Sequence, residues 1–135
     1  MHPDPVYRPV ASKAVLRRMK PDPAELREAA IRPSWQAYRV LTGKEQHKHF
    51  GLIRLDLERP CPTIPKSMGG STTGLVHPTE IRRIAISEAK ALASFPAAFT
   101  LVGSYEERWA RIGNSVPPLF MRAVATNLRA MLMQD

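Results

Sequence analysis

The chain has 135 residues and carries 20 Lys and Arg against 12 Asp and Glu, a formal net charge of +8 at pH 7. This length favours one compact domain and is short for an enzyme that builds its own nucleotide-binding parallel sheet. Its single cysteine excludes an internal disulfide and a cysteine-cluster metal site. The positive charge fits either a polyanionic partner, most commonly nucleic acid, or an ordinary soluble protein that is basic.

The apolar segments and the N-terminus bear on localisation. No apolar run approaches the about 20 residues that span a bilayer. The first residues, Met1 to Pro5, lack the apolar centre of a signal peptide. We therefore expect a soluble, cytoplasmic protein with no membrane partner.

Three short helices are predicted in the first part of the chain. Ser12 is placed to cap a helix over residues 13–19. Asp22, followed by Pro23 and Glu25, predicts a second helix that runs to about Ile31. Ser34 starts a third, over residues 35–41. The basic side chains of these helices form either a solvated face or a surface that docks on nucleic acid; they are Arg17, Arg18, Lys20, Arg27 and Arg39.

The spacing of apolar residues changes in the middle of the chain, from a helical to a strand-like period. Apolar and charged residues alternate over residues 53–58, which predicts a half-buried strand in a small antiparallel sheet around residues 50–65. Residues 60–65 contain three prolines and are too proline-rich for a central strand. Residues 66–78 form a glycine-rich loop that suits either close approach of a phosphate or a flexible surface. His47 and His49 lack further ligand partners, so a solvated turn is favoured over a metal site.

Helical patterns return in the last third. One helix is expected from about Ser87 to the break at Phe95-Pro96. Ser104 and Glu107 have the spacing of a capping box and predict a helix through Ile112. Gly113 is then expected at the position after the helix, with a positive φ.

The final helix, expected from Pro118 to about Met133, is the most apolar part of the chain. Its polar residues Arg122, Thr126 and Arg129 form one narrow stripe, and bulky apolar side chains dominate the remainder. A surface helix needs an apolar face of only about 100°. We therefore expect this helix to meet a partner that the chain lacks, or to form a homodimer.

An ordered series of short motifs follows residue 50. It contains Arg54-Leu-Asp, Pro60-Cys-Pro-Thr-Ile64, Gly69-Gly70, His77-Pro78, Phe95-Pro96 and Gly113-Asn-Ser-Val-Pro-Pro118. The series, over roughly residues 50–130, resembles the end of the target-recognition region followed by motifs IX and X of the DNA (cytosine-5) methyltransferases. The resemblance implies an α+β chain of short helices, a small antiparallel sheet and a long C-terminal helix, as a fragment of a larger α/β methyltransferase.

The same resemblance divides the chain into three parts. Residues 1–49 become a helical basic part of the target-recognition region, residues 50–79 its strand and glycine loop, and residues 80–135 the helical tail with motifs IX and X. Motif IX departs from the family pattern because Ala85 stands where a threonine usually caps the helix. Such a loss costs about 1 kcal/mol, and we expect the helix to start later, capped by Ser87.

No catalytic residue is predicted. Cys61 lies in a Pro-Cys dipeptide, as the family's nucleophile does, but Pro62-Thr63-Ile64 follows it and matches the segment before motif IX. We therefore interpret Cys61 as a packing residue. The family's glycine-rich cofactor motif, Pro-Cys-Gln and Glu-Asn-Val are absent from the sequence, so the chain alone is not expected to transfer methyl groups.

The resemblance implies two supporting sites and no metal site. Asn114, Ser115 and Val116 match the motif X turn that lies against S-adenosylmethionine, which would bind only together with a catalytic domain. DNA contacts are implied for Thr63, Lys66, Ser67, Gly69 and Gly70, and more weakly for Arg54. Arg82 and Arg83 either contact phosphates or tie motif IX to the recognition region, and for Arg83 we favour the structural role.

The leading hypothesis is a C-terminal fragment or small subunit of a restriction-modification enzyme that methylates cytosine C5 in DNA. Its partners would be DNA and a separate catalytic methyltransferase half. The alternative is an independent basic module that binds DNA or RNA without enzymatic activity, which predicts salt-sensitive binding by this chain alone. A weaker alternative is an interaction protein whose last helix docks on an unrelated partner.

Overall fold

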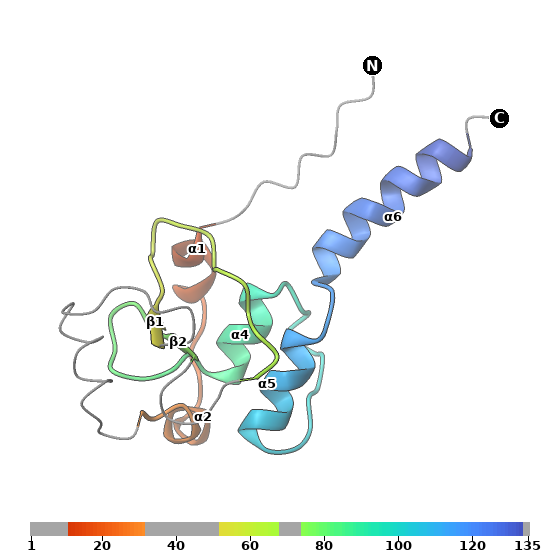
Figure 1. The fold of residues 1–135 in the computed structure, drawn as a ribbon. Coiled ribbons are helices and arrows are strands. Elements are labelled where there is room, and N and C mark those ends of the chain that lie inside the picture. Colours follow the sequence, from red (N-terminus) through yellow and green to blue (C-terminus); the bar gives the residue numbers. More distant parts are fainter. Residues whose placement is uncertain (1–10, 32–51, 68–73, 134–135) are drawn as a thin grey trace.

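The computed structural model describes residues 11–31, 52–67 and 74–133, in which short helices surround a small sheet and one helix projects from this body (Figure 1). The elements in chain order are α1 (Ser12–Leu16), α2 (Pro23–Glu28), β1 (Leu52–Arg54), β2 (Gly74–Val76), α4 (Ile86–Leu92), α5 (Tyr105–Gly113) and α6 (Pro118–Leu132). This arrangement confirms the predicted α+β class with a long last helix. None of the described helices is long and apolar enough to cross a bilayer.

The sheet has two strands, and they run parallel. Leu52 pairs with Gly74, Ile53 with Leu75 and Arg54 with Val76. The predicted antiparallel sheet around residues 50–65 is therefore wrong. The proline-rich segment after β1 leads to α5, where Trp109 binds the Pro65 carbonyl, so it does not form a hairpin with β1. The strand that pairs with β1 is instead formed by residues 74–76. Antiparallel pairing is limited, in the described ranges, to isolated bridges such as Ala11 with Pro60.

The core lies between the sheet, α4 and α5. Trp109 is completely buried there and its ring stacks on Tyr105. The Tyr105 hydroxyl donates a hydrogen bond to the Ile84 carbonyl over 2.8 Å. Leu16 of α1 and Leu75 of β2 belong to the same apolar cluster, so α1 and the sheet are fixed to α4 and α5. Helices α4 and α5 thus share one core with α1 and the sheet.

The two N-terminal helices are shorter than predicted. The Asp22 cap is confirmed, since its carboxylate accepts from the amides of Ala24 and Glu25 at 2.8 and 2.9 Å, but α2 ends at Glu28 instead of near Ile31. Ser12 does not cap α1. It is the first helical residue, it is buried, and its hydroxyl donates to the Arg59 carbonyl. The third predicted helix lies outside the described residues.

The start of α4 corrects the expectation that Ser87 caps it. The helix begins at Ile86 and Ala85 occupies the cap position, where its methyl group cannot accept a hydrogen bond. Instead, the amide and hydroxyl of Ser87 donate to the carboxylate of Glu25 in α2, at 3.0 and 2.8 Å. A carboxylate from another helix therefore replaces the acceptor that Ala85 lacks.

Helix α5 confirms one prediction and overturns another. The Ser104 and Glu107 capping box is present, with Glu107 accepting from the Ser104 amide at 2.8 Å. Gly113, however, is the last helical residue and does not have a positive φ, whereas Gly74 and Gly103 do among the described glycines. A Cβ atom at Gly113 would lie 2.6 Å from the Pro65 carbonyl oxygen and 2.7 Å from the Lys66 backbone. Close backbone approach, and not left-handed geometry, requires glycine there.

Helix α6 has no buried residue. Its bulky side chains are exposed, among them Leu128 at 53%, Met131 at 71% and Leu132 at 78%. Its first turn is held to the body by a hydrogen bond from the Leu119 amide to the Ser94 hydroxyl, 3.1 Å long. The described part of the chain thus leaves every residue of α6 at least partly exposed, and Figure 1 shows α6 extending away from the other labelled elements.

Candidate cofactor and DNA interface

The predicted cofactor turn follows directly from the end of α5. The Asn114 amide donates to the Ala110 carbonyl at 2.9 Å, and the amide and hydroxyl of Ser115 both donate to the Ile112 carbonyl at 3.1 and 2.6 Å. These bonds fix the turn while the Asn114 side chain stays exposed and Val116 is 49% exposed. The turn therefore presents an amide and an apolar side chain outward, whereas the Ser115 hydroxyl keeps only its acceptor capacity.

The predicted DNA segment is an extended stretch that crosses α5. Thr63, Lys66 and Ser67 are exposed on it, and Gly69 and Gly70 lie outside the described residues. The Trp109 indole N–H donates to the Pro65 carbonyl at 2.8 Å and fixes the segment against the helix. The exposed hydroxyls and the ammonium group thus lie on a backbone segment that Trp109 of α5 fixes in place.

The two predicted sites meet at Gly113. Its backbone touches that of Pro65 and Lys66, so the Asn114 turn and the Lys66 segment are neighbours although they lie far apart in the sequence. The motif series does not predict that these two sites are neighbours. The sequence signal for the contact is Gly113, for which a positive φ is predicted instead.

Arg54 is engaged by the protein. Its guanidinium donates to the carbonyls of Pro78 and His77 at 2.8 and 3.3 Å, and the side chain is half-buried at the end of β1. These bonds tie the strand to the turn after β2. Arg54 therefore has a structural role in this fold, and any contribution to DNA contact would rely on its remaining N–H groups.

A buried polar network underlies motif IX, and the sequence analysis missed it. Arg82 is 7% exposed and donates to both oxygens of Glu88 at 2.7 and 2.9 Å, and to Glu80 at 2.8 Å. The His77 Nδ1 atom accepts from the amides of Thr79 and Glu80. Burial, and then the nearby Arg82 charge, lower the pKa of His77. Because buried charges need partners, we infer that this cluster fixes the segment before α4 to the first turn of that helix.

Arg82 and Arg83 both make contacts within the protein, which supports a structural role for them over contact with phosphates. Arg82 is enclosed by its carboxylates and cannot reach a phosphate. The Arg83 guanidinium lies 4.5 Å from the centre of the Tyr105 ring and donates to the Glu28 carbonyl. A cation over an aromatic face adds a modest attraction. Arg83 therefore ties the motif IX segment to α2 and α5.

Cys61 is half-buried and packs against the core. Its thiol donates to the Pro62 carbonyl at 3.2 Å, and burial raises its pKa to about 12. A nucleophilic cysteine needs a pKa lowered by cationic neighbours or a helix N-terminus. This environment supports the interpretation of Cys61 as a packing residue.

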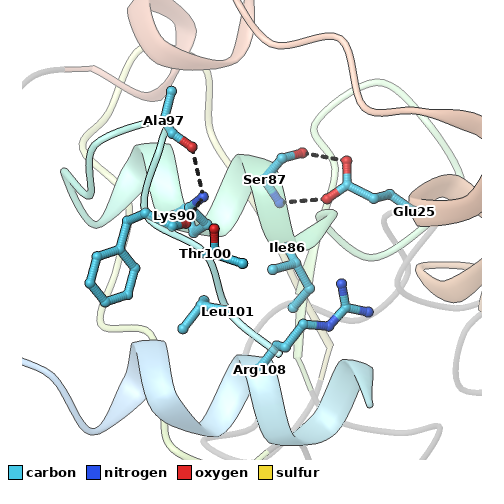
Figure 2. A pocket seen from close by; sticks show the side chains of 9 residues that line it. Glu25, Ile86, Ser87, Lys90, Ala97, Thr100, Leu101 and Arg108 are labelled. Atoms are coloured by element: carbon cyan, nitrogen blue, oxygen red, sulfur yellow. Dashed lines mark hydrogen bonds between the residues drawn. The ribbon is translucent and has the colours of Figure 1, made fainter. Parts of the chain in front are cut away.

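A hollow of about 220 Å³ lies between α2, the start of α4, the loop before α5, and α5 itself. Figure 2 shows that its polar groups bind one another: Glu25 accepts from Ser87, and the Lys90 ammonium donates to the Ala97 carbonyl at 3.1 Å. Lys90 also donates to the Phe99 carbonyl, and Arg108 pairs with Glu28. The hollow is a packing feature of this fold, and we assign it no ligand. Across the described ranges, no group of three or more His, Cys, Asp and Glu side chains is arranged to hold a metal ion.

Comparison with known proteins decides the family. Residues 13–130 match the family described as C-5 cytosine-specific DNA methylase. The chain belongs to this family. It is 36% identical over 81 residues to the type II methyltransferase M.AplI of Arthrospira platensis, in a match that covers 56% of this chain and 24% of M.AplI. It is 28% identical over 127 residues to the DNA (cytosine-5-)-methyltransferase M.ApeKI of Aeropyrum pernix, covering 92% of this chain and 25% of that enzyme.

The methylase relatives differ greatly in length. The chain spans about a quarter of M.AplI and M.ApeKI. In contrast, it is 32% identical over 102 residues to the type II methyltransferase M.AquIB of Picosynechococcus sp., and that match covers 66% of this chain and 71% of M.AquIB. At least one related type II methyltransferase is therefore a chain of similar size to this one.

Proposed function

We propose that this methylase-family chain is the C-terminal part of a cytosine-5 DNA methyltransferase and works with a catalytic domain that it does not contain. Residues 1–79 would belong to the target-recognition region and residues 80–135 to the motif IX and X tail. The complete enzyme would transfer the methyl group of S-adenosylmethionine to cytosine C5 in DNA. The chain contributes support for cofactor and DNA, and no catalytic group.

The observation that carries this proposal is the exposure of α6. The helix has no buried residue, and its exposed apolar side chains run along its full length. A helix that is apolar over most of its surface is normally buried. Its start is nevertheless fixed, because Ser94 binds the Leu119 amide. We infer that α6 docks on the catalytic domain and that Pro117 and Ser94 set its direction.

The turn before α6 gives the docked helix a role at the cofactor. Asn114 and Val116 are exposed at the point where α5 ends, immediately before the helix that docks. Docking would carry both side chains to the surface of the catalytic domain. There the Asn114 amide would hydrogen-bond the polar end of S-adenosylmethionine and Val116 would pack beside it.

The similar size of M.AquIB supports a two-chain form of this enzyme. In this form the catalytic motifs lie on a separate polypeptide and the present chain is the small subunit. A homodimer through α6 is the competing use of the same surface. It would cover one side of the helix and leave the rest of its apolar surface exposed, so we favour the catalytic partner.

The proposal is tested by complementation in trans. M.AplI and M.ApeKI, each lacking the segment that matches this chain, are mixed with it, and transfer of radioactive methyl groups from S-adenosylmethionine to DNA is measured. We expect incorporation in at least one mixture and none from the separate components. The double variant L128D/L132D, which places charges on α6, should abolish it. The control I81D/V102D changes two apolar residues of comparable exposure outside α6 and should leave methyl transfer intact. Inactive mixtures with both halves would count against the proposal.

A further inference from the structure

The corner between α1 and α2 carries exposed cations. We define the basic corner as Arg17, Arg18, Lys20 and Arg27, all of which are exposed. The first three follow the buried Leu16 at the end of α1, and Arg27 lies in α2. Figure 1 shows an extended connection that leads from α1 to α2. Three of the four cations therefore lie on the connection that follows α1, and the fourth lies on α2.

The acidic residues of the corner are engaged elsewhere. The Asp22 carboxylate accepts from the amides of Ala24 and Glu25 at the start of α2. The Glu25 carboxylate accepts from Ser87, and the Glu28 carboxylate pairs with Arg108. Each carboxylate is held by a partner in α2, α4 or α5, so none of them neutralises the corner by direct pairing with its cations.

Several cations elsewhere in the described ranges have ion-pair partners. Lys13 pairs with Glu58, Arg59 with Asp56, and Arg82 with Glu80 and Glu88. For the four corner cations, the structure records no ion pair with a described residue. The corner thus carries four exposed positive charges, in a chain whose formal net charge is +8.

The backbone beneath the corner is fixed. The Ser12 hydroxyl donates to the Arg59 carbonyl, and Leu16 is buried in the core that includes α4. Helix α2 is held by its Asp22 cap and by the bond from Ser87 to Glu25. A rigid base for long basic side chains reduces the entropy that is lost when they bind a ligand.

We propose that the basic corner binds the phosphate backbone of duplex DNA, at a contact separate from the predicted Thr63 to Gly70 segment. Arginine offers a planar set of N–H donors that suits phosphate oxygens, and lysine adds a point charge. Such contacts give affinity and register without reading the sequence. This inference rests on the proposed function for the identity of the polyanion, and it adds a DNA contact at α1 and α2.

The test uses the full chain and a fluorescein-labelled 30-base-pair duplex. Binding is followed by fluorescence anisotropy between 50 and 300 mM NaCl for the wild type, R17Q/R18Q and the matched control R122Q/R129Q. Both variants lose two positive charges from exposed arginines, so net charge alone affects them equally. Each lost phosphate contact lowers the slope of log K against log salt by about 0.9. We expect R17Q/R18Q to lower the slope by about two and the affinity at 100 mM NaCl roughly tenfold, with the control unchanged.

Three outcomes would overturn the proposal: no measurable binding of the duplex by the wild type at 50 mM NaCl, equal slopes for wild type and R17Q/R18Q, or equal losses in R17Q/R18Q and the control. A dependence on Arg17 and Arg18 seen only with a 30-base-pair RNA duplex would also contradict it. Retained binding in R17K/R18K and unchanged thermal unfolding of all variants support a charge contact. Methyl transfer in trans is scored separately, so failure here is distinguishable from failure of the proposed function.

Discussion

At the scale of single residues, Gly113 gives the sharpest prediction. In an unhindered helix, Gly113→Ala would stabilise the protein, because alanine has the higher helix propensity by about 1 kcal/mol. Here the new Cβ would lie 2.6 to 2.7 Å from the backbone of Pro65 and Lys66. We expect destabilisation by about 1–3 kcal/mol, as for overpacked sites. Urea unfolding measures the sign directly, with the exposed N114A as the control. Increased stability of Gly113→Ala would contradict the close contact.

His77 predicts how stability depends on pH. Burial lowers its pKa in the folded state, and its Nδ1 atom accepts two backbone N–H groups, so the fold requires the neutral ring. A lowered folded pKa contributes stability that is complete above the unfolded value of about 6.5 and is lost as the pH falls below it. Urea unfolding at pH 7.5, 6.5 and 5.5 should therefore show decreasing stability. The variant H77Q should lose this dependence, and a wild type equally stable at all three pH values would exclude the mechanism.

At the scale of elements, the start of α4 depends on a carboxylate from α2. Glu25 accepts two bonds from Ser87, where Ala85 offers no acceptor. Glu25→Ala should cost about 0.5–2 kcal/mol, the range of a lost N-cap. Ser87→Ala keeps the amide bond to Glu25 and should cost less. Chemical unfolding of the two single variants and the double variant tests this order, and equal or reversed costs would contradict the capping role.

Helix α6 should contribute almost nothing to the stability of the body. It has no buried residue, and the Leu119 amide in its first turn donates to the Ser94 hydroxyl. A chain that ends at Pro117 should therefore lose no more than about 2 kcal/mol of unfolding free energy relative to the full chain, because no core side chain is removed. Denaturant titration of both chains checks this. A loss of several kcal/mol would mean that α6 packs on its own body.

The elements that sequence patterns predicted well are those set by local chemistry. The caps at Asp22 and Ser104 depend on side chains two or three residues from the amides they bind, and both are present. The parallel pairing of β1 with β2 depends on where a proline-rich segment leads, which no local pattern encodes. The same holds for the Glu25 cap of α4 and the Gly113 contact, because each joins segments distant in sequence.

At the scale of the whole molecule, the candidate sites have one common arrangement. The exposed Lys66 segment and the Asn114 turn meet at Gly113, and α6 begins just beyond them. Their neighbourhood was not predictable from spacing, although the residues themselves were named from the motif series. In the proposed enzyme, docking of α6 would bring this edge to the catalytic domain as one surface, with the proposed DNA segment beside the proposed cofactor turn.

The most direct test of the account is hydrogen exchange of the α6 amides, measured by mass spectrometry. Isolated helices of about 15 residues are marginal in water, so α6 in the free chain should exchange far faster than α4 and α5. In a mixture with a catalytic half that transfers methyl groups, we predict strong protection along α6 and little change in α4. Equal protection of α6 in the free chain, or an active mixture in which α6 stays unprotected, would contradict its role as the docking element.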